Sequence, residues 1–360
     1  MNTPVNLEAV TLSWLRAALA GAGEFVPGDL IGFEMIRIGG EVAYSGQLAR
    51  CRLHFRRSAA NAPRSIVVKI TPLRAAVHPF FSTENRHEVL FYQQFASATI
   101  APIPKCYFGK IDEQAGVCVL LLQDLSDMRS VDAAIGCSPE QADLVIRHMA
   151  EFHAGWWNNA ALGASAWLPD CTDFADTPYM DWWRRYPRAI AQTVAGRSIS
   201  RAYFETGRRL FERLPVILAE LAQPPVTCIH RDFYADNILF GSSPDEPPLM
   251  VVDWSLVGRG RGVADVTYFM VGSMSPEQRR ATEHGLVRTY HAQLLARGIR
   301  EYSFAECWRD YRLAVVGKLF VSVLATVLFD NSSPRRRAWR LADLQRLHAF
   351  LEDHQLAALV

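Results

Sequence analysis

The sequence predicts an α+β protein of two lobes, a small β-rich N-terminal lobe and a larger, mainly helical C-terminal lobe. Its 360 residues, 50% of them hydrophobic, are enough to bury the cores of two such lobes. Short β-type runs separated by Gly, Ser, Asn and Pro dominate the chain up to Leu122. Beyond that point helix-start signals recur, so we expect the lobes to be residues 1–122 and 123–360.

The small lobe is expected to hold two helices and four strands. The runs that predict them are, in chain order, a helix over Leu7–Gly21, strands over Ile31–Ile38, Gln47–Phe55 and Ser65–Thr71, a helix over Glu84–Ala96 and a strand over Val117–Leu122.

The large lobe begins its helices with recognisable caps. Ser138, Ser275 and Ser303 are each followed three residues later by Gln or Glu, the pattern of a capping box. One island of strand character interrupts the helices: Asn237–Phe240 and Leu249–Trp254, joined by the turn-rich GSSPDEPP. We therefore expect a short hairpin inside a helical lobe.

Charge and cysteine content exclude several classes of protein. Lys and Arg number 38 and Asp and Glu 37, so no basic excess favours nucleic acid or an anionic membrane surface. The seven cysteines are scattered and form no CxxC pair, which favours reduced thiols in a cytoplasmic protein over disulfides or a zinc site. MNTPVNLEAV carries no secretory signal pattern.

One segment, Leu313–Phe329, is almost continuously apolar. Gly317 and Lys318 interrupt it, and a charge at mid-bilayer costs about 2.5–3.5 kcal/mol on insertion scales. We therefore expect a buried core helix and no membrane span.

The strongest chemical signal is the string HRDxxxxN, His230 to Asn237, followed sixteen residues after Asn237 by Asp253. Phosphoryl transfer needs a carboxylate beside the attacking hydroxyl and oxygen ligands for Mg²⁺ beside the phosphates. Asp232 suits the first task as catalytic base, and Asn237 and Asp253 suit the second. The predicted hairpin would bring the three to one end. The alternative is that these are ordinary turn residues, a core histidine and a strand-end acid.

A lysine in a strand supports the same chemistry. Lys69 lies in the apolar run Ser65–Ile70, where a solvated charge is unexpected, and the chain has only four lysines against 34 arginines. A lysine so placed can reach the phosphates of ATP and pair with a helix glutamate. Glu88 is the expected partner and Glu84, one turn earlier, the alternative; an edge-strand lysine and a solvated helix face are the ordinary interpretations.

Two further segments are expected to bind the nucleotide. The glycine-containing turn between the first two strands can bring backbone N–H groups to phosphate oxygens, although an ordinary hairpin turn has the same composition. The end of the last small-lobe strand would form a hinge that holds adenine through backbone groups. The residues concerned are Gly39, Gly40 and Ser45 in the turn and Gln123, Asp124 and Leu125 in the hinge.

These motifs resemble a known family. HRDFYADNILF followed by VVDWS resembles the catalytic loop and metal-binding segment of the aminoglycoside phosphotransferase and choline kinase superfamily, over about Ile36–Phe269. HEVLFYQQF, MAEFHAGWWN and the ending FYADNILF are most similar to its ecdysteroid-kinase-like branch. The resemblance implies a protein-kinase-like fold, Asp232 as base, Asn237 and Asp253 as metal ligands, and Asp265 as a brace for the catalytic loop. The family often has Gly where this chain has Arg231.

The acceptor is expected to be a small molecule. A protein kinase would carry an activation segment ending in Ala-Pro-Glu, and no such tripeptide occurs in the chain, so no protein substrate is expected. From residue 138 onward, 25 acidic residues balance 25 Lys and Arg, which gives a polycationic acceptor no acidic lobe to bind. Phe152–Tyr186 holds nine aromatic residues that would line either an apolar acceptor pocket or an ordinary core.

The sequence therefore predicts a cytoplasmic kinase that uses ATP and Mg²⁺ to phosphorylate a hydroxyl group of a small molecule with an apolar body. An aminoglycoside, a macrolide or a choline-type compound is the alternative acceptor. A pseudokinase that serves as a ligand-binding module is the alternative of another class, but the chain carries the full set Lys69, Glu88, Asp232, Asn237 and Asp253.

Overall fold

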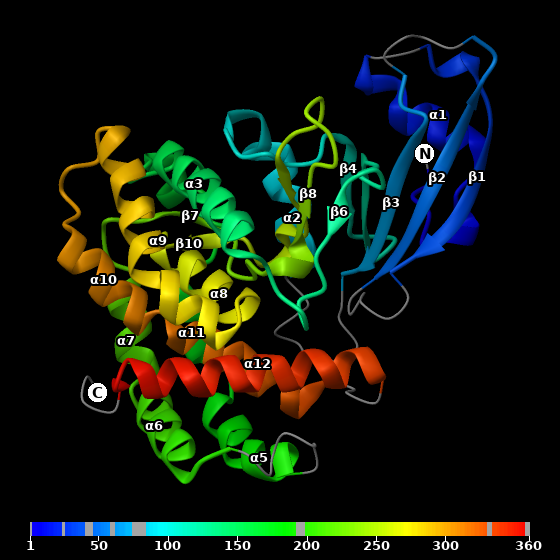
Figure 1. Ribbon diagram of the computed structural model, residues 1–360. Helices are drawn as coiled ribbons and strands as arrows, with labels where there is room; N and C mark the ends of the chain where they lie inside the picture. The colour runs from blue at the N-terminus through cyan, green and yellow to red at the C-terminus, as the bar shows by residue number, and fades with distance from the viewer. Residues whose placement is uncertain are drawn as a thin grey trace. The chain divides into compact units, whose positions relative to one another are not determined.

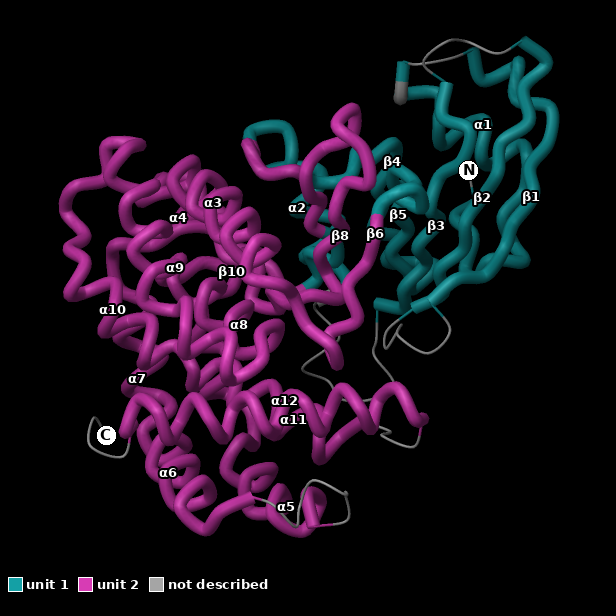
Figure 2. The backbone as a smooth tube through the Cα atoms, in the orientation of Figure 1, with its two compact units in different colours: residues 1–98, 103–128, 252–255 teal, residues 99–102, 129–251, 256–360 magenta. Residues whose placement is uncertain are grey.

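The computed structural model describes residues 2–23, 26–39, 46–57, 62–73, 84–191, 199–329 and 333–356. They belong to two compact units, shown in two colours in Figure 2. Unit 1 comprises residues 1–98, 103–128 and 252–255, and unit 2 comprises residues 99–102, 129–251 and 256–360. The chain thus enters unit 1 a last time, for four residues, long after the rest of that unit is complete.

Unit 1 is built on an antiparallel sheet with the strand order β1-β2-β3-β5-β4 (Figure 2). Its strands are β1 (Leu30–Ile38), β2 (Gln47–Phe55), β3 (Ser65–Pro72), β4 (Cys106–Asp112) and β5 (Val117–Gln123). The central strands β3 and β5 are nearly continuous apolar runs, as expected for strands covered on both faces. Their register places Lys69 opposite Leu120, in the middle of the sheet.

Two helices accompany this sheet, α1 (Leu12–Leu19) and α2 (Glu84–Gln94). Helix α1 buries Trp14, Leu15 and Leu19 in one core cluster with the sheet residues Cys51 and Ile66. It begins at Leu12 because the Thr11 side chain caps it by accepting from the Trp14 N–H. The continuous helix expected over Leu7–Gly21 was therefore too long, since a separate 3-10 turn, η1 (Leu7–Ala9), precedes the cap.

The four strands expected in this region are confirmed to within one residue at each end. Strand β4 was not expected. Its sequence, CYFGKID, mixes Gly and Lys with aromatic residues, and all of its residues are only partly buried, so it lacks the apolar pattern of its neighbours. It is the last strand in the sheet order and pairs with β5 alone.

Unit 2 is mainly helical. Its helices are α3 (Pro139–Gly155), α4 (Ala160–Ala164), α5 (Tyr179–Ala191), α6 (Arg201–Glu212), α7 (Leu214–Leu221), α8 (Val263–Ser273), α9 (Pro276–Ala296), α10 (Phe304–Leu313), α11 (Val315–Leu328) and α12 (Pro334–Asp353). The capping boxes expected at Ser138, Ser275 and Ser303 are present at the starts of α3, α9 and α10. The fold class is α+β, as the sequence predicted, with an antiparallel sheet in the N-terminal part and helices in the C-terminal part.

Helix α8 lies at the centre of unit 2, and all of its residues except Ala264 are buried. Helices α9, α10, α11 and α12 pack around it, and α11 and α12 also contact each other. Figure 1 shows α12 as the long red helix that runs beside α11. Asp265, in the first turn of α8, accepts hydrogen bonds from the backbone of the loop at His230 and Arg231, so this helical core supports the loop.

One helical run of the described residues, Phe304–Leu328, is long and apolar enough to cross a membrane by length and composition alone. Of its most apolar window, 72% is buried inside the protein. Core helices of folded proteins share these properties, so the burial favours the core helix expected over Leu313–Phe329.

Short strands frame the catalytic loop of unit 2. β7 (Thr227–Ile229) pairs with β10 (Gly258–Gly260), and β8 (Ile238–Phe240) lies between β6 (Arg129–Ser130) and β9 (Leu249–Val251). The loop from His230 to Asn237 connects β7 to β8, with its last turn in the 3-10 helix η8 (Ala235–Asn237). The predicted hairpin is present as β8 and β9.

Candidate active site

In unit 1 a buried lysine binds two carboxylates. Lys69, on β3, places its Nζ 2.7 Å from Oε2 of Glu88 on α2 and 3.1 Å from Oδ1 of Asp253. Lys69 is 8% and Glu88 2% exposed, so the pair is largely withdrawn from water. The structure therefore brings together three of the predicted site residues, and Glu88 is the partner of Lys69 rather than Glu84.

The charges of this group depend on one another. Burial alone would lower the pKa of Lys69, but the carboxylates of Asp253 and Glu88 raise it above its usual value, so the ammonium stays charged. Burial raises the pKa of Glu88, and the ammonium of Lys69 partly offsets that effect. The lysine therefore keeps a fixed position and its positive charge beside these two carboxyl groups.

Asp253 reaches this group on a short, strained segment. Its backbone has φ 63°, in the left-handed region that side chains other than glycine rarely adopt. The next residue, Trp254, is 1% exposed and stacks on Phe91 of α2, with ring centroids 4.1 Å apart and planes 7° apart. The Trp254 backbone also hydrogen-bonds Glu88. These contacts hold the Asp253 backbone, while its side chain is 44% exposed.

The predicted hinge lies at the end of β5 in unit 1. Gln123 exchanges backbone and side-chain hydrogen bonds with Lys105, at 2.8 and 3.2 Å. The Asp124 carboxylate accepts from Ser65 Oγ at 2.6 Å and pairs with Arg50 at 2.9 Å, which ties the hinge to β3 and β2. Leu125 is half-buried. A role for these residues in holding adenine stays a prediction.

The predicted phosphate loop is described only at its ends. Gly39 follows β1 with φ 74°, a left-handed conformation suited to glycine. Gly46, just before β2, lies so close to β3 that a Cβ there would be 2.9 Å from the carbonyl oxygen of Ile70. Gly40 and Ser45 lie outside the described residues, so their predicted contacts with phosphate are not tested.

In unit 2 a buried aspartate braces the catalytic loop. Asp265, in the first turn of α8 and 1% exposed, accepts from the backbone N–H groups of His230 at 2.7 Å and of Arg231 at 2.9 Å. His153 of α3, itself braced by Tyr290, contacts the same carboxylate at 3.3 Å. The expected bracing role of Asp265 is confirmed.

The Asp232 carboxylate is held from both sides. Tyr268 of α8 donates its hydroxyl to Oδ1 at 2.7 Å, and Asn237 donates its Nδ2 to Oδ2 at 3.1 Å and to the Asp232 backbone oxygen at 2.9 Å. The nearby Asp236 is placed differently, since it accepts from the Ala133 N–H at 2.9 Å and pairs with Arg335 at 3.0 Å. This arrangement favours Asp232 over Asp236 as a base.

Arg231 has a structural place. Its φ is 68°, and its guanidinium pairs with Asp173 at 2.6 Å while lying 4.2 Å from the ring centroid of Phe174. The left-handed backbone explains why glycine would suit this position. The ion pair and the ring contact offset the strain that an arginine has there.

The donor set suits a hard cation. Because Asn237 turns its Nδ2 toward Asp232, its carbonyl oxygen is the atom that it can offer to a metal. The half-exposed carboxylate of Asp253 would be the second oxygen donor. Among the described residues no group of three or more His, Cys, Asp or Glu could hold a metal. A site with two protein oxygens completed by phosphates is compatible with both observations. Asp253 belongs to unit 1 and Asn237 to unit 2, so their predicted meeting stays a prediction.

The aromatic stretch Phe152–Tyr186 mostly belongs to the core. Six of its nine aromatic side chains are buried: Phe152, Trp156, Phe174, Trp182, Trp183 and Tyr186. Phe174 stacks on Phe320, Trp182 meets the same ring edge-on, and Trp183 packs against Phe211. The core alternative is therefore favoured over an acceptor pocket.

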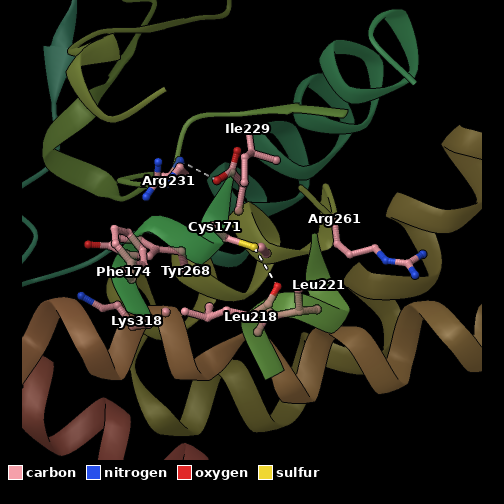
Figure 3. A pocket seen from close by; sticks show the side chains of 13 residues that line it. Cys171, Phe174, Leu218, Leu221, Ile229, Arg231, Arg261, Tyr268 and Lys318 are labelled. Atoms are coloured by element: carbon pink, nitrogen blue, oxygen red, sulfur yellow. Dashed lines mark hydrogen bonds between the residues drawn. The ribbon is translucent and has the colours of Figure 1, made fainter. Parts of the chain in front are cut away.

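A cavity of about 40 Å³ lies within unit 2 behind the catalytic loop (Figure 3). Cys171, Ile229 and Leu218 line it together with Arg231 and Tyr268. Small-molecule pockets occupy roughly 300–1,000 Å³, so this cavity has room for little more than water. It is a packing feature and not an acceptor site.

Tyr268 was missed in the sequence because it lies in the apolar run VADVTYFMVG, where it looks like one more core aromatic. A signal was nevertheless present. Tyr268 follows Asp265 by three residues in a helix, so the two share a face. Once Asp265 is assigned to the loop, Tyr268 is expected to face the loop as well.

Three solved structures similar to the chain are kinases. One is a choline/ethanolamine kinase family protein from Mesorhizobium loti, with 14% identity, TM-score 0.53 and coverage of 97% of this chain and 99% of that one. A choline kinase from Cryptosporidium parvum Iowa II has 11% identity, TM-score 0.54 and 97% coverage of both chains. An amicoumacin kinase in complex with AMP-PNP and Ca²⁺ has 10% identity, TM-score 0.54 and coverage of 89% and 90%. These likenesses confirm the expected protein-kinase-like fold.

At the level of sequence, no curated protein matches the chain. A family model does: that of the phosphotransferase enzyme family matches residues 53–309, which include Lys69, Glu88 and the catalytic loop. The matched segment is well over half of the 360 residues. The chain belongs to the phosphotransferase enzyme family.

Proposed function

We propose that this protein is a kinase that transfers the γ-phosphoryl group of ATP to a hydroxyl group of a small molecule. The observation that carries the proposal is the buried ion pair of Lys69 and Glu88 with Asp253 beside it. A fixed ammonium in the middle of a sheet is suited to the phosphates of ATP. Family membership supports phosphoryl transfer in general, and the acceptor and the metal are inferred from the site.

Each residue of the site has a task in this reaction. Asp232 accepts the proton of the acceptor hydroxyl as that hydroxyl attacks the phosphorus, and Lys69 binds phosphate oxygens. Asn237 and Asp253 would hold Mg²⁺, which neutralises charge on the phosphates when bound. A pseudokinase is not supported, because every residue that it would usually lack is present and Lys69 pairs with Glu88.

The structural neighbours raise choline-type acceptors as an alternative. A quaternary ammonium would bind over aromatic rings. In unit 2 the rings grouped with Asp232 are Tyr268, Tyr234 and Trp339. Lys318 already lies 4.6 Å from the Tyr268 centroid and 5.7 Å from that of Trp339. Since the protein's own cation lies over two of these rings, we favour an uncharged acceptor over a choline-type one, and keep the apolar body that the aromatic content of the sequence suggests.

Sequence motifs, the state of the cysteines and the net charge support the family branch, the compartment and the class of acceptor. The motifs HEVLFYQQF and MAEFHAGWWN support the ecdysteroid-kinase-like branch. All seven cysteines lie in the described residues as free thiols, six of them buried, which suits a reducing compartment such as the cytoplasm. The near-zero net charge supports a small-molecule acceptor rather than nucleic acid.

The test is a screen of acceptors. Purified protein, Mg²⁺-ATP and a library of hydroxyl compounds are incubated, and mass spectrometry detects a gain of about 80 Da, one phosphoryl group. The library contains sterols and polyketides, choline and ethanolamine, a macrolide and kanamycin. Asp253→Ala is the control, because loss of a metal ligand should abolish the gain. Phosphorylation of an apolar alcohol is expected; turnover of choline or kanamycin alone would reject the acceptor class, and no phosphorylated product would reject the kinase.

A further inference from the structure

The hydroxyl of Tyr268 donates to the carboxylate of Asp232 at 2.7 Å, the shorter of the two contacts described above for that carboxylate. We propose that Tyr268 is a positioning residue for the base of the reaction, and that the buried pair of Lys318 and Asp343 holds its ring in place. The proposal rests on the function inferred above, in which Asp232 is that base.

A base needs a fixed orientation as well as a suitable chemistry. Rotation of an aspartate about χ2 is broad and costs little, so the side chain alone does not set the plane of its carboxylate. Here Oδ1 accepts from Tyr268 and Oδ2 from Asn237. The two donors come from different elements and grip opposite oxygens. A hydroxyl acceptor must come within about 2.6–3.2 Å of one carboxylate oxygen. The two hydrogen bonds fix the plane of the carboxylate and therefore the position of that oxygen.

Tyr268 stays protonated and therefore remains a hydrogen-bond donor. It is 6% exposed, and burial together with the neighbouring Asp232 raises its pKa well above the usual value. The phenol therefore keeps its proton under all ordinary conditions. Its backbone is also fixed, since it lies in α8, one turn beyond the Asp265 that braces the start of the catalytic loop.

The ring of Tyr268 is supported by an unusual ion pair. Lys318 is one of only four lysines in the chain and lies, 1% exposed, in the otherwise apolar helix α11. Its Nζ is 2.6 Å from Oδ1 of Asp343 on α12, whose Oδ2 accepts from Ser322 at 2.7 Å. The same Nζ lies 4.6 Å from the centroid of the Tyr268 ring.

A buried ion pair is a poor way to stabilise a fold, because apolar side chains of the same volume often serve as well or better. What a fixed cation adds here is an attraction to the ring face and a defined place for the ring. The ion pair therefore links two C-terminal helices to the tyrosine that donates to Asp232. A tyrosine that only stabilised the fold would make the same contacts. The test therefore has to distinguish an effect on catalysis, through the orientation of Asp232, from an effect on the stability of the fold.

A double-mutant cycle makes that separation. Tyr268→Phe removes only the hydroxyl, and Asp232→Ala removes the carboxylate that it serves. The probe is phosphate transfer from radiolabelled Mg²⁺-ATP to the hydroxyl compound found in the screen, or to water. The matched control is Tyr311→Phe, which removes another buried hydroxyl donating to a carboxylate, that of Glu283 at 3.0 Å.

Hydrogen bonds to charged groups typically contribute about 1.5–3 kcal/mol, so Tyr268→Phe should lower kcat by about 10- to 100-fold. The KM for ATP should change by less than about twofold, since the tyrosine acts only through the base. In the Asp232→Ala background the same substitution should have almost no further effect on kcat. Tyr311→Phe should have a lower melting temperature than the wild type but the same kcat.

Three results would overturn the proposal. Wild-type kcat in Tyr268→Phe would show that the hydroxyl does not position the base. An equal loss of kcat with and without the Asp232 carboxylate would indicate a structural effect. An equal loss in Tyr311→Phe would show that any buried hydroxyl matters. A wild-type protein with no turnover at all would reject the underlying function instead, whereas an active wild type with an unaffected Tyr268→Phe would reject this inference alone.

A second variant tests the ion pair, and its first measurement, made with Tyr268 in place, does not require Tyr268→Phe to fold. Lys318→Gln removes the cation beside the ring, while Asp343 keeps Arg340, 3.5 Å from its Oδ2, as a counter-ion. We expect kcat to fall by about 3- to 10-fold, as for a partly loosened catalytic contact, and the loss to disappear when Phe already occupies position 268. Unchanged kcat, or a loss that persists with Phe at 268, would remove Lys318 and Asp343 from the proposal.

Discussion

Lys69 shows at the scale of one residue how a buried charge can be kept by its neighbours. Its ammonium lies between Glu88 and Asp253, and it is the counter-ion of the buried Glu88 carboxylate, whereas the Asp253 side chain is 44% exposed. Removing one member of such a group is more harmful than removing the pair, because a lone buried charge costs several kcal/mol. Stability and function can therefore be separated by mutation.

Lys69→Met is expected to lower the melting temperature and to abolish ATP turnover, since it leaves Glu88 buried without its cation. The double variant Lys69→Met, Glu88→Leu should regain most of the lost stability, about 3–5 kcal/mol, and remain inactive. Thermal melts and ATP turnover of both variants are the measurements. Turnover restored in the double variant would show that Lys69 has no role with the nucleotide.

The role of Asp232 is tested by Asp232→Asn, which keeps the shape and the contact with Tyr268. Turnover should fall by about 10²–10⁴-fold, the usual range for a positioned base, with ATP affinity nearly unchanged. Asp236→Asn is the comparison: it should destabilise the protein through its lost pairing with Arg335 but retain turnover per folded molecule. The opposite pattern, an active Asp232→Asn and an inactive Asp236→Asn, would exchange the two roles.

At the scale of elements, the apolar runs predicted most of the sheet and the capping boxes predicted where α3, α9 and α10 begin. β4 could not be predicted, because its stability comes from pairing with β5 and not from its own composition. The core position of the Trp182 and Trp183 side chains was equally undecidable, since an amphipathic helix shows which face is apolar but not what covers it. The catalytic-loop motif could be recognised because its residues lie within one short stretch of the sequence, so their spacing does not depend on how distant segments pack.

The close approach of Gly46 to β3 gives a prediction for an element. A methyl group there would meet the Ile70 carbonyl and the Thr71 side chain, so Gly46→Ala should destabilise unit 1 by about 1–3 kcal/mol, as overpacking does. Gly285→Ala in α9, where a methyl group meets open space, is the matched control and should be neutral or stabilising. The measurement is the free energy of unfolding of both variants in denaturant. Equal values for the two would show that β2 and β3 can adjust at no cost.

For the whole molecule, a formal net charge of +1 means that no long-range field attracts a charged acceptor. We expect the acceptor KM to change by less than about twofold between low salt and about 0.5 M, where the Debye length has shrunk to a few ångströms. Steady-state kinetics across that range is the measurement. A steep rise of KM with salt would indicate a polycationic acceptor and would contradict the apolar one.

The four residues Val252–Ser255 belong to unit 1, but the ribosome makes them long after the rest of that unit. A ribosome adds about 5–20 residues per second, so Asp253 and Trp254 emerge roughly 6 to 25 seconds after residue 128. During that interval Phe91 lacks its stacking partner and Lys69 has only Glu88. The nascent N-terminal segment should therefore be protease-sensitive at α2 until residue 255 has been made, and stalled chains of increasing length would show the step.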